Sequence, residues 1–298
     1  MSDSGQATEE PQPITPQPPR AIEKTPMFTA MAAARYQRQT LIRDIEASQP
    51  KLLCYVAGNK APVDRIDTLG FVDMLHNIMP GDPIDLLLHT PGGDIDAAEK
   101  LIMLVRSAAG EEGQLRVIVP DYAKSAGTLM ALGANAIVMS DSSELGPIDP
   151  QVSTKDGNGS DVVYSVLTYL NAYEAATKAL RDAPDDLANR LTFEKFDPTI
   201  VRKFQSVRDR ARSFAENLLK RRGKNFSKIA SELMDINKYQ SHGQMIGWEA
   251  ASEIGLTIQY IPTADPVWRK YWALYCHLRL AIESEQRIFE SSYVSLLL

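Results

Sequence analysis

The sequence Tyr122-Ala123-Lys124-Ser125-Ala126-Gly127-Thr128 is the most informative part of this chain, together with His89-Thr90-Pro91-Gly92-Gly93-Asp94 upstream. Each follows an apolar run typical of a buried strand, and a helical pattern follows each. A glycine pair at a strand end lets bare backbone approach a ligand, because no Cβ stands in the way. A serine at a strand-to-helix turn lies where free N–H groups stabilise negative charge. Together they predict a nucleophile, Ser125, and an oxyanion hole.

A third motif, Leu145-Gly146-Pro147-Ile148-Asp149-Pro150-Gln151, follows these two along the chain. In this order the three motifs resemble the Clp/crotonase superfamily, and within it the serine dehydrogenase proteinase (SDH-type) family, relatives of ClpP and of signal peptide peptidase SppA. The resemblance extends from about residue 27 to residue 261 and includes residues 248–256 near its end. It implies an α/β fold, a ClpP/crotonase-like spiral of ββα units, and a serine peptidase. We find no Gly-x-Gly-x-x-Gly fingerprint, and we expect no cofactor.

Composition narrows the class of protein. The chain has 298 residues, 44% of them hydrophobic, and a net charge of −6, so it lacks the basic field that attracts nucleic acid. The two cysteines, Cys54 and Cys276, lie in apolar contexts and suggest reduced thiols in a cytoplasmic protein. The histidines and cysteines show no metal-ligand spacing. Because no apolar run reaches eighteen residues, we expect no membrane segment here, unlike in some SDH-type relatives.

The chain order predicts three parts. Residues 1–25 are rich in proline and indicate a disordered tail. Residues 26–262 are expected to form the ClpP-like domain, loop-rich over 140–161 and mostly helical over 162–238. Residues 263–298 are expected to form a C-terminal helical extension. Its aromatic stripe, beginning at Trp268, suits either an oligomer contact or packing within the chain.

Three residues are candidates for the base that activates Ser125. His242 has the intrinsic pKa that suits a base at neutral pH. It also lies in the approach to residues 248–256, and the resemblance implies that the corresponding approach in ClpP carries the triad aspartate. Lys178 is a candidate because SppA-type relatives use a Ser–Lys dyad. Asp149 lies about where ClpP has its catalytic histidine, so the ClpP triad does not transfer directly. Asp149 either orients His242 or shapes the pocket as a turn residue, and Lys124 is interpreted as a local charge.

The predicted oxyanion donors are the backbone N–H groups of Gly93 and Ala126, with Gly92 keeping the approach open. These residues favour a serine peptidase that cleaves peptides or unfolded protein segments and assembles as a homo-oligomer. Two alternatives remain at this stage: an acyl-CoA-binding crotonase-type enzyme, which needs the oxyanion hole without the serine, and a non-catalytic oligomeric scaffold.

Overall fold

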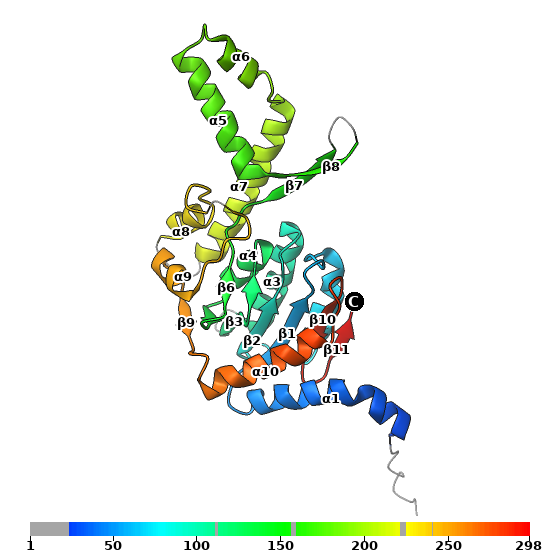
Figure 1. Ribbon diagram of the computed structural model, residues 1–298. Coiled ribbons are helices and arrows are strands. Elements are labelled where there is room, and N and C mark those ends of the chain that lie inside the picture. The colour runs from blue at the N-terminus through cyan, green and yellow to red at the C-terminus, as the bar shows by residue number, and fades with distance from the viewer. Residues whose placement is uncertain (1–23, 111–112, 156–158, 221–224, 240) are drawn as a thin grey trace, which may run out of the picture.

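The computed structural model describes residues 24–110, 113–155, 159–220, 225–239 and 241–298 (Figure 1). The tail predicted over 1–25 therefore lies, except for its last two residues, outside the described residues. A seven-stranded sheet in the order β11-β10-β1-β2-β3-β5-β9 forms the centre of the molecule. Its strands are β1 (Lys51–Ala57), β2 (Ile84–His89), β3 (Leu115–Ile118), β5 (Ala136–Met139), β9 (Ile258–Tyr260), β10 (Arg287–Glu290) and β11 (Ser295–Leu297).

The first five of these strands in chain order are parallel neighbours, and β1 and β2 are buried on both faces. In β1, Leu53 and Tyr55 point into one hydrophobic core, and Leu52 and Cys54 point into another on the opposite face. This alternation explains why β1 and β2 are continuous apolar runs, since a parallel sheet covered on both sides has no solvent face. Cys54 and Cys276 are both free thiols.

Helices cover both faces of the sheet (Figure 1). One core lies under α1 (Pro26–Glu46) and α10 (Pro266–Leu280), which pack against each other. The other and larger core includes side chains of six helices. These are α2 (Thr68–Leu75), α3 (Ile95–Ala109), α4 (Ala126–Leu132), α7 (Pro198–Lys220), α8 (Phe226–Leu233) and α9 (Trp248–Ile254), and the single 3₁₀ turn η1 (Arg65–Asp67) precedes α2. The arrangement is the mixed α/β, mostly parallel ClpP-like fold that the motifs predicted.

A helical arm projects from the sheet (Figure 1). It consists of α5 (Val166–Asp182), α6 (Leu187–Phe193) and the first half of α7, around a small core of its own centred on Leu170 and Phe204. Beside it lies a two-stranded hairpin, β7 (Gln151–Lys155) with β8 (Asp161–Ser165). The mostly helical character expected over 162–238 is present, but the first residues of that range form β8, and the helix begins only at Val166, after the cap Ser165. β-Branched Val162 and Val163 favour the strand.

The C-terminal segment differs from the helical extension that its sequence suggested. After α10, residues 287–290 and 295–297 add two antiparallel strands to the main sheet, with β10 paired to β1. Four residues are too short a run for periodicity to separate a strand from a helix, and the pairing partner is more than 200 positions away. Most of the aromatic stripe of α10 packs within the chain: Trp268, Tyr271 and Tyr275 are buried, whereas Trp272 is exposed.

Candidate active site

Ser125 occupies a strained turn between a strand and a helix. The two-residue strand β4 (Tyr122–Ala123) pairs with β6 (Glu144–Leu145), and α4 begins directly after the serine. Ser125 has φ 52° and ψ −114°, a region that residues with a Cβ rarely occupy. Such strain persists only where the surrounding structure enforces it, and a sharp strand-to-helix turn is how serine hydrolases expose their nucleophile.

Backbone hydrogen bonds hold the glycine turn against this elbow. Thr90 N–H donates to Tyr122 O over 3.1 Å, and Lys124 N–H donates to Thr90 O over 3.1 Å. Gly127 makes the close approach possible, since a Cβ there would lie 2.5 Å from Thr90 Cγ2. Two segments that are more than thirty residues apart are thus fixed beside each other by their main chains alone.

Two backbone amides at the glycine turn and the elbow have no acceptor among the residues that the structure describes, and the two segments approach closely at Gly92. Gly92 has φ +102°, and a Cβ added to it would lie 2.8 Å from Ser125 Cβ and 3.3 Å from Ala126 N, so the open approach requires glycine. Gly92 N–H itself donates to Thr90 Oγ1. In the described part of the chain, neither Gly93 N–H nor Ala126 N–H has an acceptor. The structure therefore places all three predicted oxyanion residues next to Ser125.

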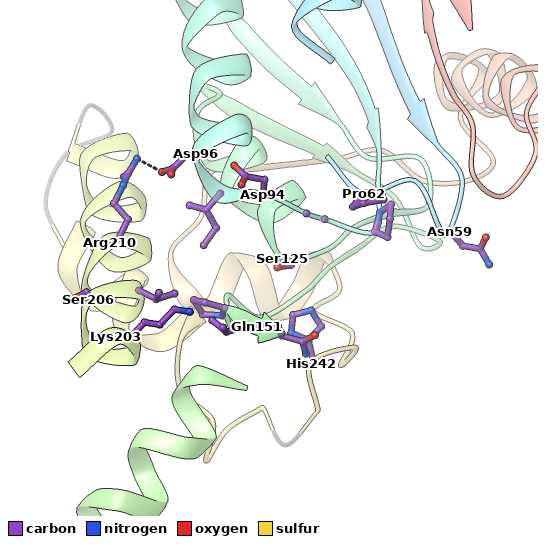
Figure 2. Close-up of a pocket in the computed structure, with 17 residues that line it drawn as sticks. Asn59, Pro62, Asp94, Asp96, Ser125, Gln151, Lys203, Ser206, Arg210 and His242 are labelled. Carbon is purple, nitrogen blue, oxygen red and sulfur yellow. Dashed lines mark hydrogen bonds and ion pairs between the residues drawn. The ribbon is translucent and has the colours of Figure 1, made fainter. Parts of the chain in front are cut away.

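His242 lines two cavities, one of which it shares with Ser125 and the other with Asp149. A cavity of about 850 Å³ is lined by Ser125, Gly92, Gly93 and His242 (Figure 2). A second cavity, of about 140 Å³, is lined by His242, Asp149 and Ser165. His242 and Gln151 line both cavities, whereas Ser125 lines only the first and Asp149 only the second. The structure therefore brings His242 to the pocket of the serine and to the pocket of the carboxylate.

The contacts of Asp149 fix its carboxylate. His242 Nδ1 lies 3.4 Å from Asp149 Oδ2, close enough for an ion pair, although the angle does not satisfy a hydrogen bond. Ser165 Oγ donates to Asp149 Oδ1 over 2.8 Å. Among the described residues Ser125 Oγ has no hydrogen-bond partner, and catalytic hydrogen bonds of this kind often shorten only when substrate binds.

The two lysines of the sequence analysis have other positions. Lys178 is exposed on the projecting part of α5 and faces a different surface pocket, twelve residues along the helix from its start, or about 18 Å at 1.5 Å per residue. The structure does not bring it to Ser125. Lys124 is close in sequence but its Nζ contacts Glu144 and backbone carbonyls instead of the serine. The structure places Lys124 as the local charge that its sequence position suggested.

The cavity walls are mixed in character. Apolar side chains come from Pro62, Pro91, Ile95, Pro150, Val152 and Val207. The charged residues are mostly neutralised: Arg210 of α7 pairs with Asp96 and Glu99, and Asp94 caps α3 by accepting from Ala97 N–H. Lys203 of α7 extends into the cavity and has no ion-pair partner in the described ranges (Figure 2).

Behind the glycine turn, His89 is fully buried at the end of β2. Its Nδ1 lies 3.2 Å from Tyr275 Oη, which donates to Asp121. Burial, with Arg279 as a lesser cause, lowers the pKa of His89 from 6.5 to about 3. The imidazole is therefore neutral at physiological pH and packs as a core residue.

Across the described segments, no group of three or more potential metal ligands is found, and none of their helices has the length and apolar character needed to span a bilayer. The sequence analysis missed three contributors to the site: Ser165, Lys203 and the anchoring contacts of Lys124. Ser165 could have been identified from the sequence as a helix N-cap, because a serine at the start of a helix, three positions before Thr168, is typical of that position. Nothing local to Lys203 or Lys124 indicated what each would face.

Comparison with known proteins agrees with this geometry. Residues 72–188 match the family model described as ClpP-like SDH-type serine proteinase. Two uncharacterized proteins of Methanocaldococcus jannaschii are similar in sequence. One is 34% identical over 59% of this chain and 53% of its own length, and the other is 41% identical over 24% and 23%. This chain thus covers about half or less of these relatives, and their names assign no activity.

Two solved structures are similar in fold, and both are variants of the 1510-N membrane-bound stomatin-specific protease. One has 18% identity and a TM-score of 0.44, covering 73% of this chain and 83% of that one. The other, in complex with a substrate peptide, has 15% identity and a TM-score of 0.37, covering 77% and 99%. The class that the fold and the serine elbow define is that of the ClpP-like α/β proteins. Within it, residues 72–188, which include Ser125 and Asp149, match the model of the ClpP-like SDH-type serine proteinase family.

Proposed function

We propose that this protein is a serine peptidase with Ser125 as nucleophile, His242 as general base and Asp149 as the residue that orients the imidazole. The observation that carries the proposal is the strained elbow of Ser125 facing a cavity that His242 also lines, with His242 Nδ1 3.4 Å from Asp149 Oδ2. Imidazole between a hydroxyl and a carboxylate is the arrangement that makes a serine nucleophilic at neutral pH. The chain order Ser, Asp, His occurs in other hydrolases and does not affect the chemistry.

In this mechanism Ser125 Oγ attacks the carbonyl carbon of the substrate while His242 Nε2 accepts the hydroxyl proton. The negative charge on the substrate oxygen is stabilised by Gly93 N–H and Ala126 N–H, each contributing roughly 3–4 kcal/mol on the scale of such donors. The C–N bond then breaks and His242 returns the proton to the leaving amine. A water, deprotonated by the same imidazole, hydrolyses the ester and restores Ser125.

The cavity supports a peptide substrate. It is open to solvent beside β7 and has apolar walls and polar backbone groups, a lining that suits an extended chain with mixed side chains. A crotonase-type reaction would need a free carboxylate base, whereas both carboxylates that line this cavity, Asp94 and Asp96, are engaged in a helix cap and an ion pair. The proposal extends to peptides or unfolded segments as substrates, a homo-oligomer in solution and a cytoplasmic location.

Labelling with a fluorophosphonate tests the proposal directly. We expect stoichiometric modification of Ser125, located by mass spectrometry, and none in Ser125→Ala. Ser252→Ala, which removes an exposed hydroxyl on α9, is the matched control and should label like the unmodified protein. Folded protein that is not labelled, and that cleaves nothing in a broad peptide library, would contradict the proposal. If such protein still forms a defined oligomer by analytical ultracentrifugation, the scaffold alternative is favoured.

A further inference from the structure

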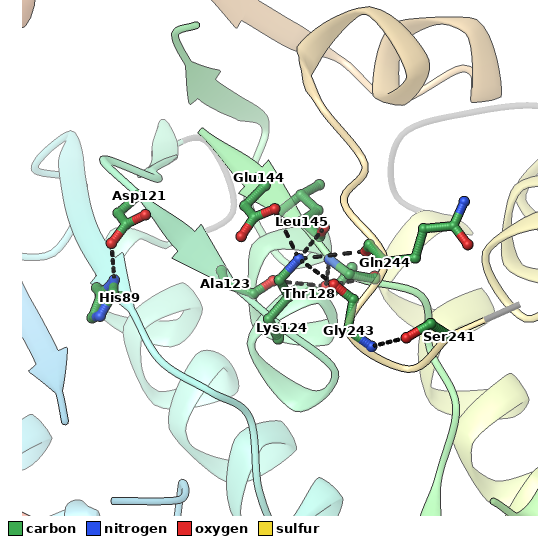
Figure 3. A network of polar contacts seen from close by, with 11 residues as sticks. His89, Asp121, Ala123, Lys124, Thr128, Glu144, Leu145, Ser241, Gly243 and Gln244 are labelled. Carbon is green, nitrogen blue, oxygen red and sulfur yellow. Dashed lines mark hydrogen bonds and ion pairs between the residues drawn. The ribbon is translucent and has the colours of Figure 1, made fainter. Parts of the chain in front are cut away.

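The side chain of Lys124 connects the serine elbow to the segment that carries His242 (Figure 3). Its Nζ lies 3.2 Å from Leu145 O, 3.3 Å from Gly243 O and 3.4 Å from Gln244 O. Glu144 Oε2 lies 3.1 Å away and balances the charge. The Lys124 side chain is 13% exposed, so this cation is largely removed from water. A lysine next to a nucleophile thus directs its charge at four oxygens and away from the serine.

The segment that it reaches is a turn over residues 241–244. The turn is closed within itself, because Gln244 N–H donates to Ser241 O and Gly243 N–H donates to Ser241 Oγ. At its C-terminal end, Ile246 exchanges two backbone hydrogen bonds with Leu145. The turn therefore behaves as a small unit, anchored to the β6 strand at residue 246 and to the elbow through Lys124, with His242 between its ends.

We propose that Lys124 is a positioning residue that holds the 241–244 turn, and with it His242, at a fixed distance from Ser125. An ammonium has three N–H donors and no acceptor, and hydrogen bonds from a charged donor to carbonyls are about twice as strong as neutral ones. Because Lys124 and Ser125 share a peptide bond, the contact transmits the position of the elbow directly to the turn. The catalytic part of this inference rests on the proposed function, whereas the anchoring of the turn does not.

Lys124→Met tests the inference, since it keeps the length of the side chain and removes the charge. We expect amide hydrogen exchange over residues 241–246 to accelerate at least about tenfold, because the turn loses its tie to the elbow. We expect the rate of fluorophosphonate labelling at Ser125 to fall about 10- to 100-fold, because a small displacement of the base is costly in rate. Lys124→Arg, which keeps donors and charge, should restore much of both signals.

Lys270→Met, on the exposed side of α10, is the matched control and should change neither readout. Exchange over 241–246 and labelling that both remain within about twofold of the unmodified protein in Lys124→Met would overturn the inference. If the unmodified protein fails to label but the turn still loosens in Lys124→Met, the anchoring stands and the proposed function fails. If Lys124→Met does not fold, Lys124→Gln, which retains an amide donor, takes its place with the same criteria.

Discussion

The serine side and the base side of this site are built in different ways. Main-chain hydrogen bonds between adjoining strand ends hold the segments that carry Ser125 and the two glycines. The close approach depends on Gly92 and Gly93, because a Cβ at either position would clash with neighbouring atoms. Asp149 and His242 are oriented by side chains, beside the backbone pair of Ile246 and Leu145: Ser165 contacts the carboxylate, Lys124 contacts the turn, and one 3.4 Å contact joins the two. The first half of the site is therefore fixed by backbone geometry, and the second depends on a few polar contacts between distant segments.

This difference predicts how substitutions on the base side combine. We expect His242→Gln to reduce turnover by about ten thousandfold, because the serine then has no base, and Asp149→Asn to reduce it less. The double variant should be no worse than His242→Gln alone, because residues that act as one unit are not additive. Single-turnover rates with an ester or peptide substrate measure this.

The two variants serve as controls for each other, because neither touches the elbow. Thermal unfolding should remain within a few degrees of the unmodified protein in both. If the reductions in rate multiply in the double variant, Asp149 and His242 act separately, as a pocket residue and an independent base. That result would contradict a catalytic triad.

A second prediction concerns the serine side, where neutral His89 lies behind the glycine turn. The unfolded chain binds a proton at His89 below pH 6.5, whereas the folded chain binds it only near pH 3. The free energy of unfolding should therefore fall as pH decreases between these values, by at most about 1.4 kcal/mol per pH unit from this group.

Urea unfolding of His89→Gln across pH 4–7 isolates the effect, since glutamine does not titrate and all other groups contribute equally to both proteins. The variant should have the shallower dependence on pH. Equal slopes for the two proteins would show that His89 is protonated in the folded state. The serine side would then contain a buried imidazolium, which contradicts the prediction.

The smallest expected effect is the release of strain at the elbow itself. Ser125→Gly should be more stable than Ser125→Ala by about 1 kcal/mol, because glycine adopts φ 52° and ψ −114° freely and alanine does not. Differential scanning calorimetry would show this as a shift of about 2–4 °C for a chain of this size. A glycine variant no more stable than the alanine variant would mean that the turn is not strained.

How much the sequence could predict follows the same division. The serine and both glycines were predictable because their signals are local: strand patterns that end in small residues, with helical patterns after them. The parallel sheet was predictable from the same runs. Asp149 and His242 were identifiable as candidates from their residue types, but their contact was not, since it depends on how segments 93 positions apart approach each other.

Other features depended on contacts that no local pattern records. β10 is a strand because it pairs with β1, and its four residues would suit a helix equally well. Lys178 had the right residue type on a helix of the right kind, but the arm directs that part of α5 away from the sheet. Lys203, by contrast, has an exposed side chain that faces the cavity only because α7 forms one wall of that cavity.

The helix α7 has one further consequence. Its first half, with Val201 and Phe204, packs in the core of the arm, and its second half, with Ala211 and Phe214, packs in the main core. The stretch between them forms a wall of the cavity. Because α7 packs in both cores, a tilt of the arm would move this wall and change the width of the cavity, while Ser125, His242 and Asp149 lie on other segments.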